Sequence, residues 1–523
     1  MPTIRSIPSG VPGLDRVLGG GFPEYSFNLI VGDPGTGKTT LVNQIIFSNA
    51  TEEAPALYIT LAGEPPIKML RYQQQFTFFD RSKVGGAVEL VNLEDEVVSG
   101  ELEGLLGRIE MEVERVDPAF VVVDSMTSLH GTIFGPGVDD GGANLRHFVR
   151  RLGMFLTRWE ATTFLIGELS DETIPQSPIF TVSDGILRLD QVIYEDATVR
   201  KLRVLKVRGR REIPGFHTLR ITGDGVHVFP RIGPPRVEPG AAGGGGRRRL
   251  SFGVEGLDAM TSGGALEGDS IMVSGPSGSG KSVLAMHFLR AGLEAGESVV
   301  VAAFEENPSQ YRERAEQIGI DWAGAEADGR LVLVHQPLPD LSVTEAFAEI
   351  AARVEELGAT RVVVDSLTGL EISVSDPSER RVREGIYQNV RALTDRGVAV
   401  LLVSEVGQTV DALRLTPHEV SVLADDVILQ RYVEIRGELE NVLTVVKMRR
   451  SGHSRIFHRY EIREDGLHVG QAVRNFHGVL TGVPQLTGEP ETALGERRTG
   501  AARGGTDDGA AEAGDGDIGT GPA

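Results

Sequence analysis

Cysteine is absent from the 523-residue sequence, and this excludes a disulfide framework, cysteine-ligated zinc and thiol catalysis. Long apolar runs are absent too: no stretch of about 18 apolar residues offers a membrane span. The opening residues, 1–8, lack the apolar core of a secretion signal. Together these absences predict a cytoplasmic protein with no membrane partner.

Positive charge is in deficit, because 52 Lys and Arg residues stand against 74 Asp and Glu residues and leave a net charge of −22. The chain also lacks stretches in which aromatic and basic residues interleave, so nucleic acid is a disfavoured partner, although a local basic channel is compatible with this total. The composition, 40% hydrophobic and 24% charged, is that of a globular protein. The length predicts two large domains or three smaller ones.

The chain does contain the phosphate-binding pattern Gly-x-x-x-x-Gly-Lys-Ser/Thr, from Gly275 to Ser282. It follows the apolar run 270–274 and precedes a segment with helical spacing, 283–289, which is the strand–loop–helix context that phosphate binding requires. Glycines let backbone N–H groups turn inward around phosphates, and the helix N-terminus adds a favourable dipole. Lys281 would reach the β- and γ-phosphates, and the hydroxyl of Ser282 would ligate Mg²⁺.

The same pattern occurs a second time, from Gly32 to Thr39, again after an apolar run, 27–31. One match in a chain with 66 glycines is compatible with chance, but two in the same context are not. The residues predicted to bind nucleotide are Gly32, Asp33, Pro34, Gly35, Thr36, Gly37, Lys38, Thr39 and Thr40 in the first loop, and Gly275, Pro276, Ser277, Gly278, Ser279, Gly280, Lys281, Ser282 and Val283 in the second.

The two loops belong to a sequence unit that occurs twice in the chain. Lys38 and Lys281 lie 243 positions apart (281 − 38), and the Val-Val-Val-Asp segments that end at Asp124 and Asp365 lie 241 apart (365 − 124). Self-similarity at a fixed spacing indicates that the chain contains two copies of one structural unit.

The repeat predicts an N-terminal ATPase domain over 1–232 and a C-terminal ATPase domain over 250–487. A stretch rich in proline and glycine, 233–249, is the predicted linker. Residues 488–523 hold few apolar side chains and predict a disordered tail.

Short β-branched runs alternate with longer amphipathic segments in each half, which predicts an α/β fold with a largely parallel sheet flanked by helices. In the second half the pattern predicts strands near 298–304, 331–335, 361–365 and 399–404, and helices near 308–318, 343–357 and 380–396.

Asp124 and Asp365 each end an all-apolar run, which is typical of a buried strand that delivers a carboxylate to the carboxyl edge of the sheet. Such a carboxylate can hold Mg²⁺ through water; the alternative is a helix cap. With a phosphate loop upstream of each, the sequence favours the metal role, together with the hydroxyls of Thr39 and Ser282.

Hydrolysis also needs a group that orients or deprotonates water, and Glu305 and Glu306 follow a predicted strand. Adjacent carboxylates disfavour each other's ionisation, which suits one of them to accept a proton, although both could simply begin a helix. In the first half, one alignment places Ala62 and Gly63 at these positions and another leaves Glu64 as a single candidate. The first site is therefore expected to bind nucleotide, with hydrolysis left open.

Two basic pairs, Lys206/Arg208 and Lys447/Arg449, end apolar runs late in each half, each 82 residues after its aspartate (206 − 124 and 447 − 365). They could be ordinary edge-strand charges. Their repetition favours a shared task, in which each pair reaches the γ-phosphate held by a neighbouring subunit, as an arginine finger does. This predicts a ring assembled head to tail.

Beyond the paired loops, the second half reads Ala303-Phe-Glu-Glu306, Arg431-Tyr-Val-Glu-Ile-Arg-Gly437 and Val446-Lys-Met-Arg-Arg-Ser-Gly-His453. These segments resemble the KaiC family of RecA-like ATPases, and the resemblance spans about 4–488. It implies two tandem RecA-like P-loop NTPase domains and a homohexameric double ring that binds ATP and Mg²⁺ between subunits. It also implies a slow ATPase in the N-terminal ring and an autokinase and autophosphatase in the C-terminal ring.

The family's phosphoacceptors are an adjacent Ser-Thr pair, and the matching positions here are Ser421 and Val422. Of these two positions only Ser421 can accept a phosphoryl group, which departs from the family's ordered two-site phosphorylation. Thr416 also matches a family threonine. The alternative is that Ser421 is an ordinary surface hydroxyl.

The sequence thus predicts a P-loop ATPase with Ser/Thr autokinase activity in its second domain, acting as a ring-shaped signalling or timing protein with a possible protein partner. The alternative is a RecA-like scaffold or DNA-handling protein in which ATP drives assembly without kinase activity.

Overall fold

The computed structural model describes residues 5–61, 66–98, 102–125, 141–168, 178–194, 197–232, 247–335, 341–373, 379–405, 424–435, 438–473, 476–477 and 485–486. Of the predicted functional residues, Glu64, Thr416 and Ser421 lie outside these ranges, as do 233–246 of the linker and the tail after 486. Within the described ranges, no helix is long and apolar enough to cross a membrane.

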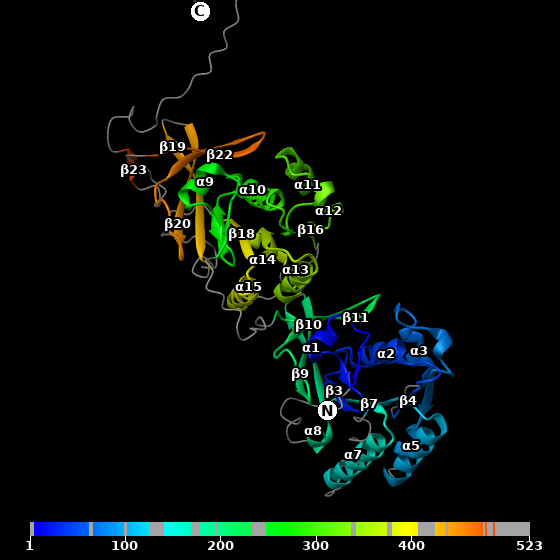
Figure 1. Ribbon diagram of the computed structural model, residues 1–523. Coiled ribbons are helices and arrows are strands. Elements are labelled where there is room, and N and C mark those ends of the chain that lie inside the picture. The colour runs from blue at the N-terminus through cyan, green and yellow to red at the C-terminus, as the bar shows by residue number, and fades with distance from the viewer. Residues whose placement is uncertain are drawn as a thin grey trace, which may run out of the picture.

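Each half of the chain is built on a nine-stranded sheet flanked by helices (Figure 1). The strand order is β11-β10-β9-β8-β3-β7-β6-β4-β5 in the first half and β22-β21-β20-β19-β14-β18-β17-β15-β16 in the second. The strands from β8 to β5 and from β19 to β16 run parallel, and the remaining three in each sheet are antiparallel. The prediction of two RecA-like domains with largely parallel sheets is confirmed.

The first half contains the strands β1 Ser6–Ile7, β2 Phe22–Pro23, β3 Phe27–Gly32, β4 Ala56–Thr60, β5 Val88–Asn92, β6 Phe120–Asp124, β7 Thr162–Gly167, β8 Gly185–Tyr194, β9 Ala197–Val207, β10 His217–Thr222 and β11 Gly225–Phe229. Its helices are α1 Leu14–Leu18, α2 Lys38–Asn49, α3 Pro66–Gln73, α4 Glu94–Val98, α5 Leu102–Val116, α7 Gly141–Arg158 and α8 Pro178–Val182, with the 3₁₀ turn η1 Arg81–Lys83.

The second half contains the strands β12 Arg249–Leu250, β13 Ala265–Leu266, β14 Ser270–Gly275, β15 Val299–Ala303, β16 Leu331–Val334, β17 Arg361–Asp365, β18 Ala399–Glu405, β19 Asp426–Ile435, β20 Glu438–Met448, β21 His458–Arg463 and β22 Gly466–Ala472, followed by β23 Phe476–His477 and β24 Gln485–Leu486. Its helices are α9 Glu255–Met260, α10 Lys281–Glu294, α11 Pro308–Gln317, α12 Trp322–Ala327, α13 Val343–Leu357, α14 Leu367–Ser373 and α15 Glu379–Thr394.

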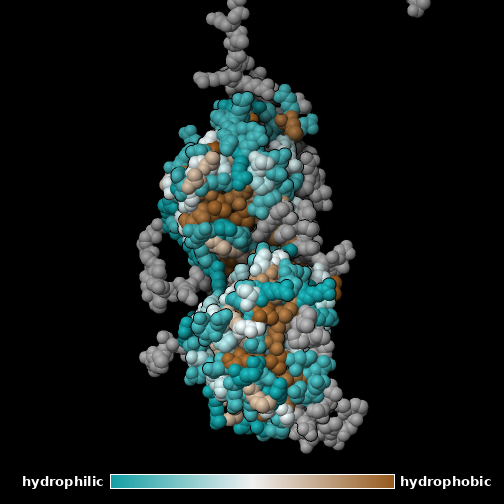
Figure 2. Space-filling view, turned by 90° about the vertical axis from the view of Figure 1, so that its right-hand side faces the viewer, coloured by the Kyte–Doolittle hydropathy of each residue, from teal (hydrophilic) through white to brown (hydrophobic). Residues whose placement is uncertain are grey.

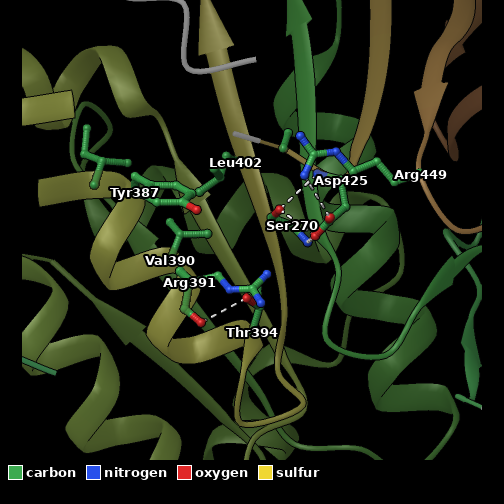
Figure 3. Close-up of a pocket in the computed structure, with 10 residues that line it drawn as sticks. Ser270, Tyr387, Val390, Arg391, Thr394, Leu402, Asp425 and Arg449 are labelled. Atoms are coloured by element: carbon green, nitrogen blue, oxygen red, sulfur yellow. Dashed lines mark hydrogen bonds and ion pairs between the residues drawn. The ribbon is translucent and has the colours of Figure 1, made fainter. Parts of the chain in front are cut away.

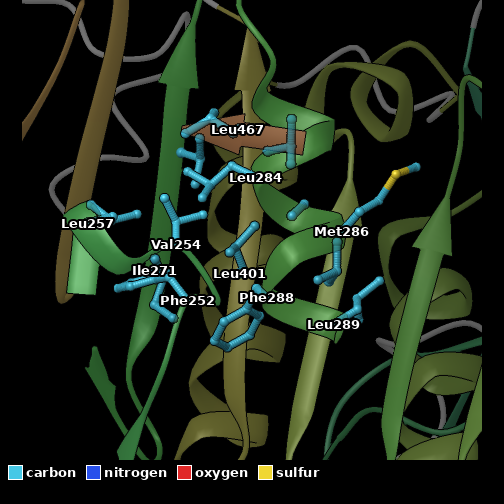
Figure 4. Packing of buried hydrophobic residues seen from close by; sticks show 14 of the residues in the cluster. Phe252, Val254, Leu257, Ile271, Leu284, Met286, Phe288, Leu289, Leu401 and Leu467 are labelled. Carbon is cyan, nitrogen blue, oxygen red and sulfur yellow. The ribbon is translucent and has the colours of Figure 1, made fainter. Parts of the chain in front are cut away.

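The central strands are largely apolar because both faces of the sheet are covered. Alternate residues of β17 serve opposite faces: Val363 packs in the cluster around α10, and Val362 and Val364 pack in the cluster around α13 and α15. Figure 4 shows Leu284 and Phe288 of α10 lying over the strands on the first of these faces. This double cover fixes each phosphate loop between a rigid strand and a rigid helix.

Several predicted elements have the observed bounds or nearly so. Helix α13 spans the predicted 343–357, and β17 spans the predicted 361–365. Helix α13 begins with a capping box, in which the side chain of Ser342 accepts from the backbone of Glu345 and that of Glu345 accepts from Ser342 N–H.

The two halves contact each other where β10 of the first meets the N-terminus of α13 in the second, and Figure 1 shows them stacked end to end. The guanidinium of Arg220 donates to both carboxylate oxygens of Glu345, at 2.7 and 2.9 Å. The hydroxyls of Thr218 and Ser342 lie 2.9 Å apart. Glu345 is therefore shared between a helix cap and an arginine of the other half.

Candidate nucleotide-binding sites

The second phosphate loop joins β14 to α10 at the carboxyl edge of the sheet. Gly278 and Gly280 adopt φ values of 77° and 85°, a region that favours glycine. A Cβ atom at Gly280 would lie 2.5 Å from Ile462 Cδ1, so this position also lacks room for a side chain. The Lys281 ammonium is buried and donates to the carbonyl of Pro276 at 2.8 Å. The Lys281 side chain is thus held against the backbone of the loop by this hydrogen bond.

The first loop has the same construction between β3 and α2. Gly35 and Gly37 adopt φ values of 79° and 100°. The Lys38 ammonium donates to the carbonyls of Gly32 and Asp33, at 2.8 and 2.9 Å. Burial lowers the pKa of Lys38, as it does that of Lys281, and nearby carboxylates oppose the shift in both cases. An anion bound in either loop would take the place of these carbonyl contacts and favour the charged lysine.

Each loop presents a hydroxyl beside the aspartate that ends a neighbouring strand. Thr39 Oγ1 donates to Asp124 Oδ2 at 3.1 Å, and Ser282 Oγ donates to Asp365 Oδ1 at 3.1 Å. The second oxygen of Asp365, Oδ2, is buried and has no hydrogen-bond partner among the described residues. Burial raises the pKa of Asp365 to about 6. A hydroxyl, a carboxylate and an unsatisfied buried oxygen form a donor set that suits Mg²⁺ or its bound water.

The two aspartates differ in their other neighbours. Tyr58, on β4, donates its hydroxyl to Asp124 Oδ2 at 2.7 Å, so that oxygen of Asp124 receives hydrogen bonds from both Tyr58 and Thr39. The position in β15 that corresponds to Tyr58 is Val301 (58 + 243), which has no hydroxyl. In the second half the tyrosine comes from a different element: Tyr311 of α11 is buried beside Asp365, so each aspartate has a tyrosine hydroxyl near it.

The predicted glutamate pair follows β15 at the same edge. The Ser366 hydroxyl donates to Glu305 Oε1, and Glu306 forms an ion pair with Arg314 of α11. The charge of Glu305 also acts on Lys281. Glu305 is therefore held beside the loop lysine, whereas Glu306 is held by a neighbouring helix.

One pair of carboxylates was missed by the sequence reasoning. Glu168 follows β7 and Glu405 ends β18, the strand next to the loop strand in each half, and each is the carboxylate with the largest effect on its loop lysine. Glu168 and Glu405 could have been found in the sequence in the same way as Asp124 and Asp365, because each is an acidic residue at the end of an apolar run. The offset of 237 (405 − 168), shorter than the other repeats, concealed the correspondence.

The late basic pairs do not lie at the loop of their own half. Lys206 pairs with Ile186, which pairs with Leu29, three residues before the end of β3 at Gly32 (32 − 29). In the second half, Lys447 pairs with Val427 and Val427 with Met272, again three residues before the strand's end (275 − 272).

Because a strand rises about 3.3 Å per residue, each pair starts about 10 Å behind its own loop and continues away from it. The side chains face the opposite edge: Lys206 Nζ donates to the carbonyl of Phe180 at 2.7 Å, and Lys447 Nζ donates to that of Ala424 at 2.6 Å. Arg208 contacts Asp184 at 3.1 Å.

A cavity of about 220 Å³ lies beside the second basic pair (Figure 3). Asp425 and Arg449 line one side, and α15 lines the other with Tyr387, Val390 and Arg391. The cavity lies at the start of β14, at Ser270, and is separate from the phosphate loop at the strand's other end.

Comparison with known proteins agrees with this geometry. The family model for the KaiC ATPase matches residues 7–232 and again residues 250–474. The circadian clock oscillator protein KaiC of Picosynechococcus sp. is 28% identical over 494 residues, which cover 92% of each chain. KaiC of Thermostichus vulcanus is 27% identical over 492 residues, and KaiC 1 of Synechocystis sp. is 27% identical over 494, with the same coverage. The chain therefore belongs to the KaiC family of P-loop ATPases.

Proposed function

We propose that this ATPase forms a homohexameric double ring, that its nucleotide sites lie between subunits, and that its second domain is a Ser/Thr autokinase. The position of the basic pairs carries the proposal. Each pair lies behind its own phosphate loop and faces the other edge of the sheet, so a nucleotide can meet it only on another subunit. Head-to-tail contacts of this kind generate a ring when the rotation between neighbouring subunits closes.

Exposed apolar side chains support self-association. Figure 2 shows hydrophobic side chains gathered on one face of each half. Ile193 and Leu439, on the hairpins that carry the basic pairs, are 72% and 67% exposed. Apolar patches on a protein surface commonly mark contact sites.

In the proposed mechanism the second loop binds the phosphates of ATP, and Lys281 contacts the β- and γ-phosphates. Mg²⁺, held by Ser282 and Asp365, would neutralise charge on the phosphates. Glu305 accepts the proton of the attacking hydroxyl, which belongs to water or to Ser421 of an adjacent subunit. The bond between the γ-phosphorus and the bridging oxygen breaks, a bond to the attacking oxygen forms, and ADP leaves. Lys447 and Arg449 of the neighbour stabilise the charge on the transferred group.

The first site has the same loop, hydroxyl and aspartate, with Lys206 and Arg208 as its basic pair. We expect it to bind ATP and Mg²⁺ through Lys38, Thr39 and Asp124. Glu64 is the candidate water-orienting residue. The hydrogen bond from Tyr58 fixes the orientation of the Asp124 carboxylate in this site.

Transfer of ³²P from labelled ATP to the protein tests the kinase. The Lys281→Ala variant should lose incorporation, and Ser421→Ala should lose most of it, with Thr416→Ala as the control for the second matching hydroxyl. Undiminished labelling of Lys281→Ala would refute the kinase assignment. Rings that assemble with ATP but never gain the mass of a phosphate would favour the scaffold alternative.

Mixed rings test the sharing of sites between subunits. All chains in this experiment carry Lys38→Ala, which silences the first site. In this background, subunits with Lys281→Ala and subunits with Arg449→Gln should each be nearly inactive when assembled alone. Mixed in equal amounts, they should recover about a quarter of the ATPase activity, because a quarter of the interfaces then combine an intact loop with an intact arginine. A mixture no more active than its parts would contradict shared sites.

A further inference from the structure

An aspartate at the same position of each half connects the phosphate-loop strand with the late basic pair. Asp184 directly precedes β8 and Asp425 directly precedes β19, 241 positions apart (425 − 184). Asp184 Oδ2 accepts from the backbone of Phe27, the first residue of β3, at 3.0 Å. Its other oxygen, Oδ1, accepts from the guanidinium of Arg208 at 3.1 Å.

The two carboxylate oxygens of Asp425 likewise contact different partners (Figure 3). Its Oδ2 accepts from the backbone N–H and the hydroxyl of Ser270, the first residue of β14, at 3.2 and 3.0 Å. Its Oδ1 lies 3.8 Å from the guanidinium groups of both Arg449 and Arg450. The backbone repeats the link, because Arg449 N–H donates to the Asp425 carbonyl at 3.1 Å.

These carboxylates are placed to orient the arginines as well as to complete the sheet. Asp425 is only 4% exposed, so its charge depends on the arginines for compensation. Arg208 is hydrogen-bonded to Asp184, and Arg449 forms a longer ion pair with Asp425. Either contact restricts the guanidinium, whereas an arginine side chain in solvent is free to sample many rotamers. The partner of the other oxygen is the strand that ends in the phosphate loop of the same subunit.

We propose that Asp184 and Asp425 are positioning residues that set the late arginines of each subunit at a fixed place relative to that subunit's own phosphate-loop strand. The inference rests on the proposed function, in which these arginines act on the nucleotide of the neighbour. It extends that function by linking the two roles of each subunit: the strand that carries its own nucleotide also anchors the arginine that serves the next one.

The variant Asp425→Asn separates this role from a purely structural one. Asparagine keeps an oxygen for the N–H and hydroxyl of Ser270, but it presents an NH₂ group to Arg449, which removes the ion pair between residue 425 and Arg449. In chains that carry Lys38→Ala, we expect the kcat for ATP to fall at least about tenfold, because small displacements of a catalytic group are costly. The KM for ATP, the affinity for a fluorescent ATP analogue and the mass of the ring should be unchanged.

Two comparisons make the test specific. Combining Asp425→Asn with Arg449→Gln should add no further loss beyond Arg449→Gln alone, since the aspartate acts through the arginine. The control Glu461→Gln removes an exposed carboxylate that contacts Arg463 at 2.9 Å and should leave kcat unchanged. If Asp425→Asn does not fold, Asp184→Asn in a Lys281→Ala chain tests the same link through Arg208.

The outcomes separate the inference from the proposed function. Full kcat in Asp425→Asn, or losses that add to those of Arg449→Gln, would overturn the positioning role while leaving the ATPase assignment intact. If the chain with both Lys38→Ala and Lys281→Ala still hydrolyses ATP at the full rate, the proposed function fails, and the inference fails with it.

Discussion

At the scale of single residues, the second half differs from the first by a cluster of buried carboxyl groups. Asp269 and Asp426 are each 1% exposed and lie beside Asp425. The corresponding residues of the first half are Ser26 (269 − 243) and Gly185 (426 − 241), which cannot ionise. Burial raises the pKa of Asp426 to about 8, and Asp269 and Asp425 add to the shift. Burial likewise raises the pKa of Asp269 to about 6.

These shifts predict that the second half loses stability as the pH rises. In the unfolded chain Asp426 titrates near its ordinary value of 3.8, so between about pH 4 and 8 only the folded state retains the proton. The variant Asp426→Asn mimics the protonated group. At pH 8 it should melt above the parent protein, by about 2–4 °C for each kcal/mol regained, and its melting temperature should change less between pH 5 and 8.

Melting followed by circular dichroism across this pH range measures the effect. The control Asp328→Asn changes an exposed carboxyl group that contacts Arg330 and should keep the parent's pH dependence above pH 5. An Asp426→Asn variant with the slope of the parent protein would contradict the assignment of the proton to this cluster.

The hydroxyl of Tyr58 predicts a change in metal affinity at the first site. Tyr58→Phe removes the hydrogen bond to Asp124 without changing the volume of the side chain. Groups that orient a metal-binding carboxylate typically contribute about 10- to 100-fold to metal affinity. In a Lys281→Ala chain, the Mg²⁺ concentration for half-maximal binding of a fluorescent ATP analogue should therefore rise about tenfold.

The exposed Tyr25 offers the matched control, since Tyr25→Phe should bind Mg²⁺ and nucleotide as the parent does. The same Mg²⁺ dependence in both variants would mean that Tyr58 does not act on the metal site. The sequence contains no signal for this contact, because it depends on how β4 and β6 are paired in the sheet.

At the scale of elements, β17 illustrates how far sequence patterns reach. Its bounds and its terminal Asp365 follow from three valines and a carboxylate. Its first residue, Arg361, is 1% exposed and lies inside the fold. Arg361 contacts Glu297 at 2.7 Å and lies over the ring of Phe288, with the guanidinium carbon 4.5 Å from its centroid. An arginine at the start of a strand would ordinarily be placed at the surface.

The variant Arg361→Met should destabilise the second half by about 3–5 kcal/mol, because it leaves the buried carboxylate of Glu297 poorly compensated. Arg248 also contacts Glu297, at 2.7 Å, and would still compensate part of its charge. The loss of stability should therefore lie toward the lower end of this range. Replacing both partners, as in Arg361→Met with Glu297→Leu, should recover much of the loss.

The two tryptophans make this measurable by urea denaturation. Trp159 lies in the first half and Trp322 in the second, so a Trp159→Phe background reports on the second half alone. Loss of the same size in the single and double variants would show that the pairing of the two charges is not the cause.

At the scale of the whole molecule, the contact between β10 and α13 should couple the unfolding of the halves. Arg220→Met leaves the carboxylate of Glu345, whose side chain is 2% exposed, without its bidentate partner. We expect a cost of about 1–3 kcal/mol, seen as a wider separation of the transitions of Trp159 and Trp322 in single-tryptophan chains. The exposed Arg5 provides the control Arg5→Met. Unchanged separation would mean that the halves unfold independently of this contact.

The phosphate loops, the hydroxyl–aspartate pairs and the parallel core were predictable from the sequence because each depends on local chemistry: glycines at a turn, a lysine and a hydroxyl at a helix start, and apolar strands ending in a carboxylate. The occurrence of each pattern in both halves supports its interpretation. Only the tertiary structure decided which groups meet across the sheet. Tyr58 reaches Asp124, Glu405 acts on Lys281, and Asp425 joins the loop strand to Arg449 through strand order and register, which the linear spacing of these residues does not encode.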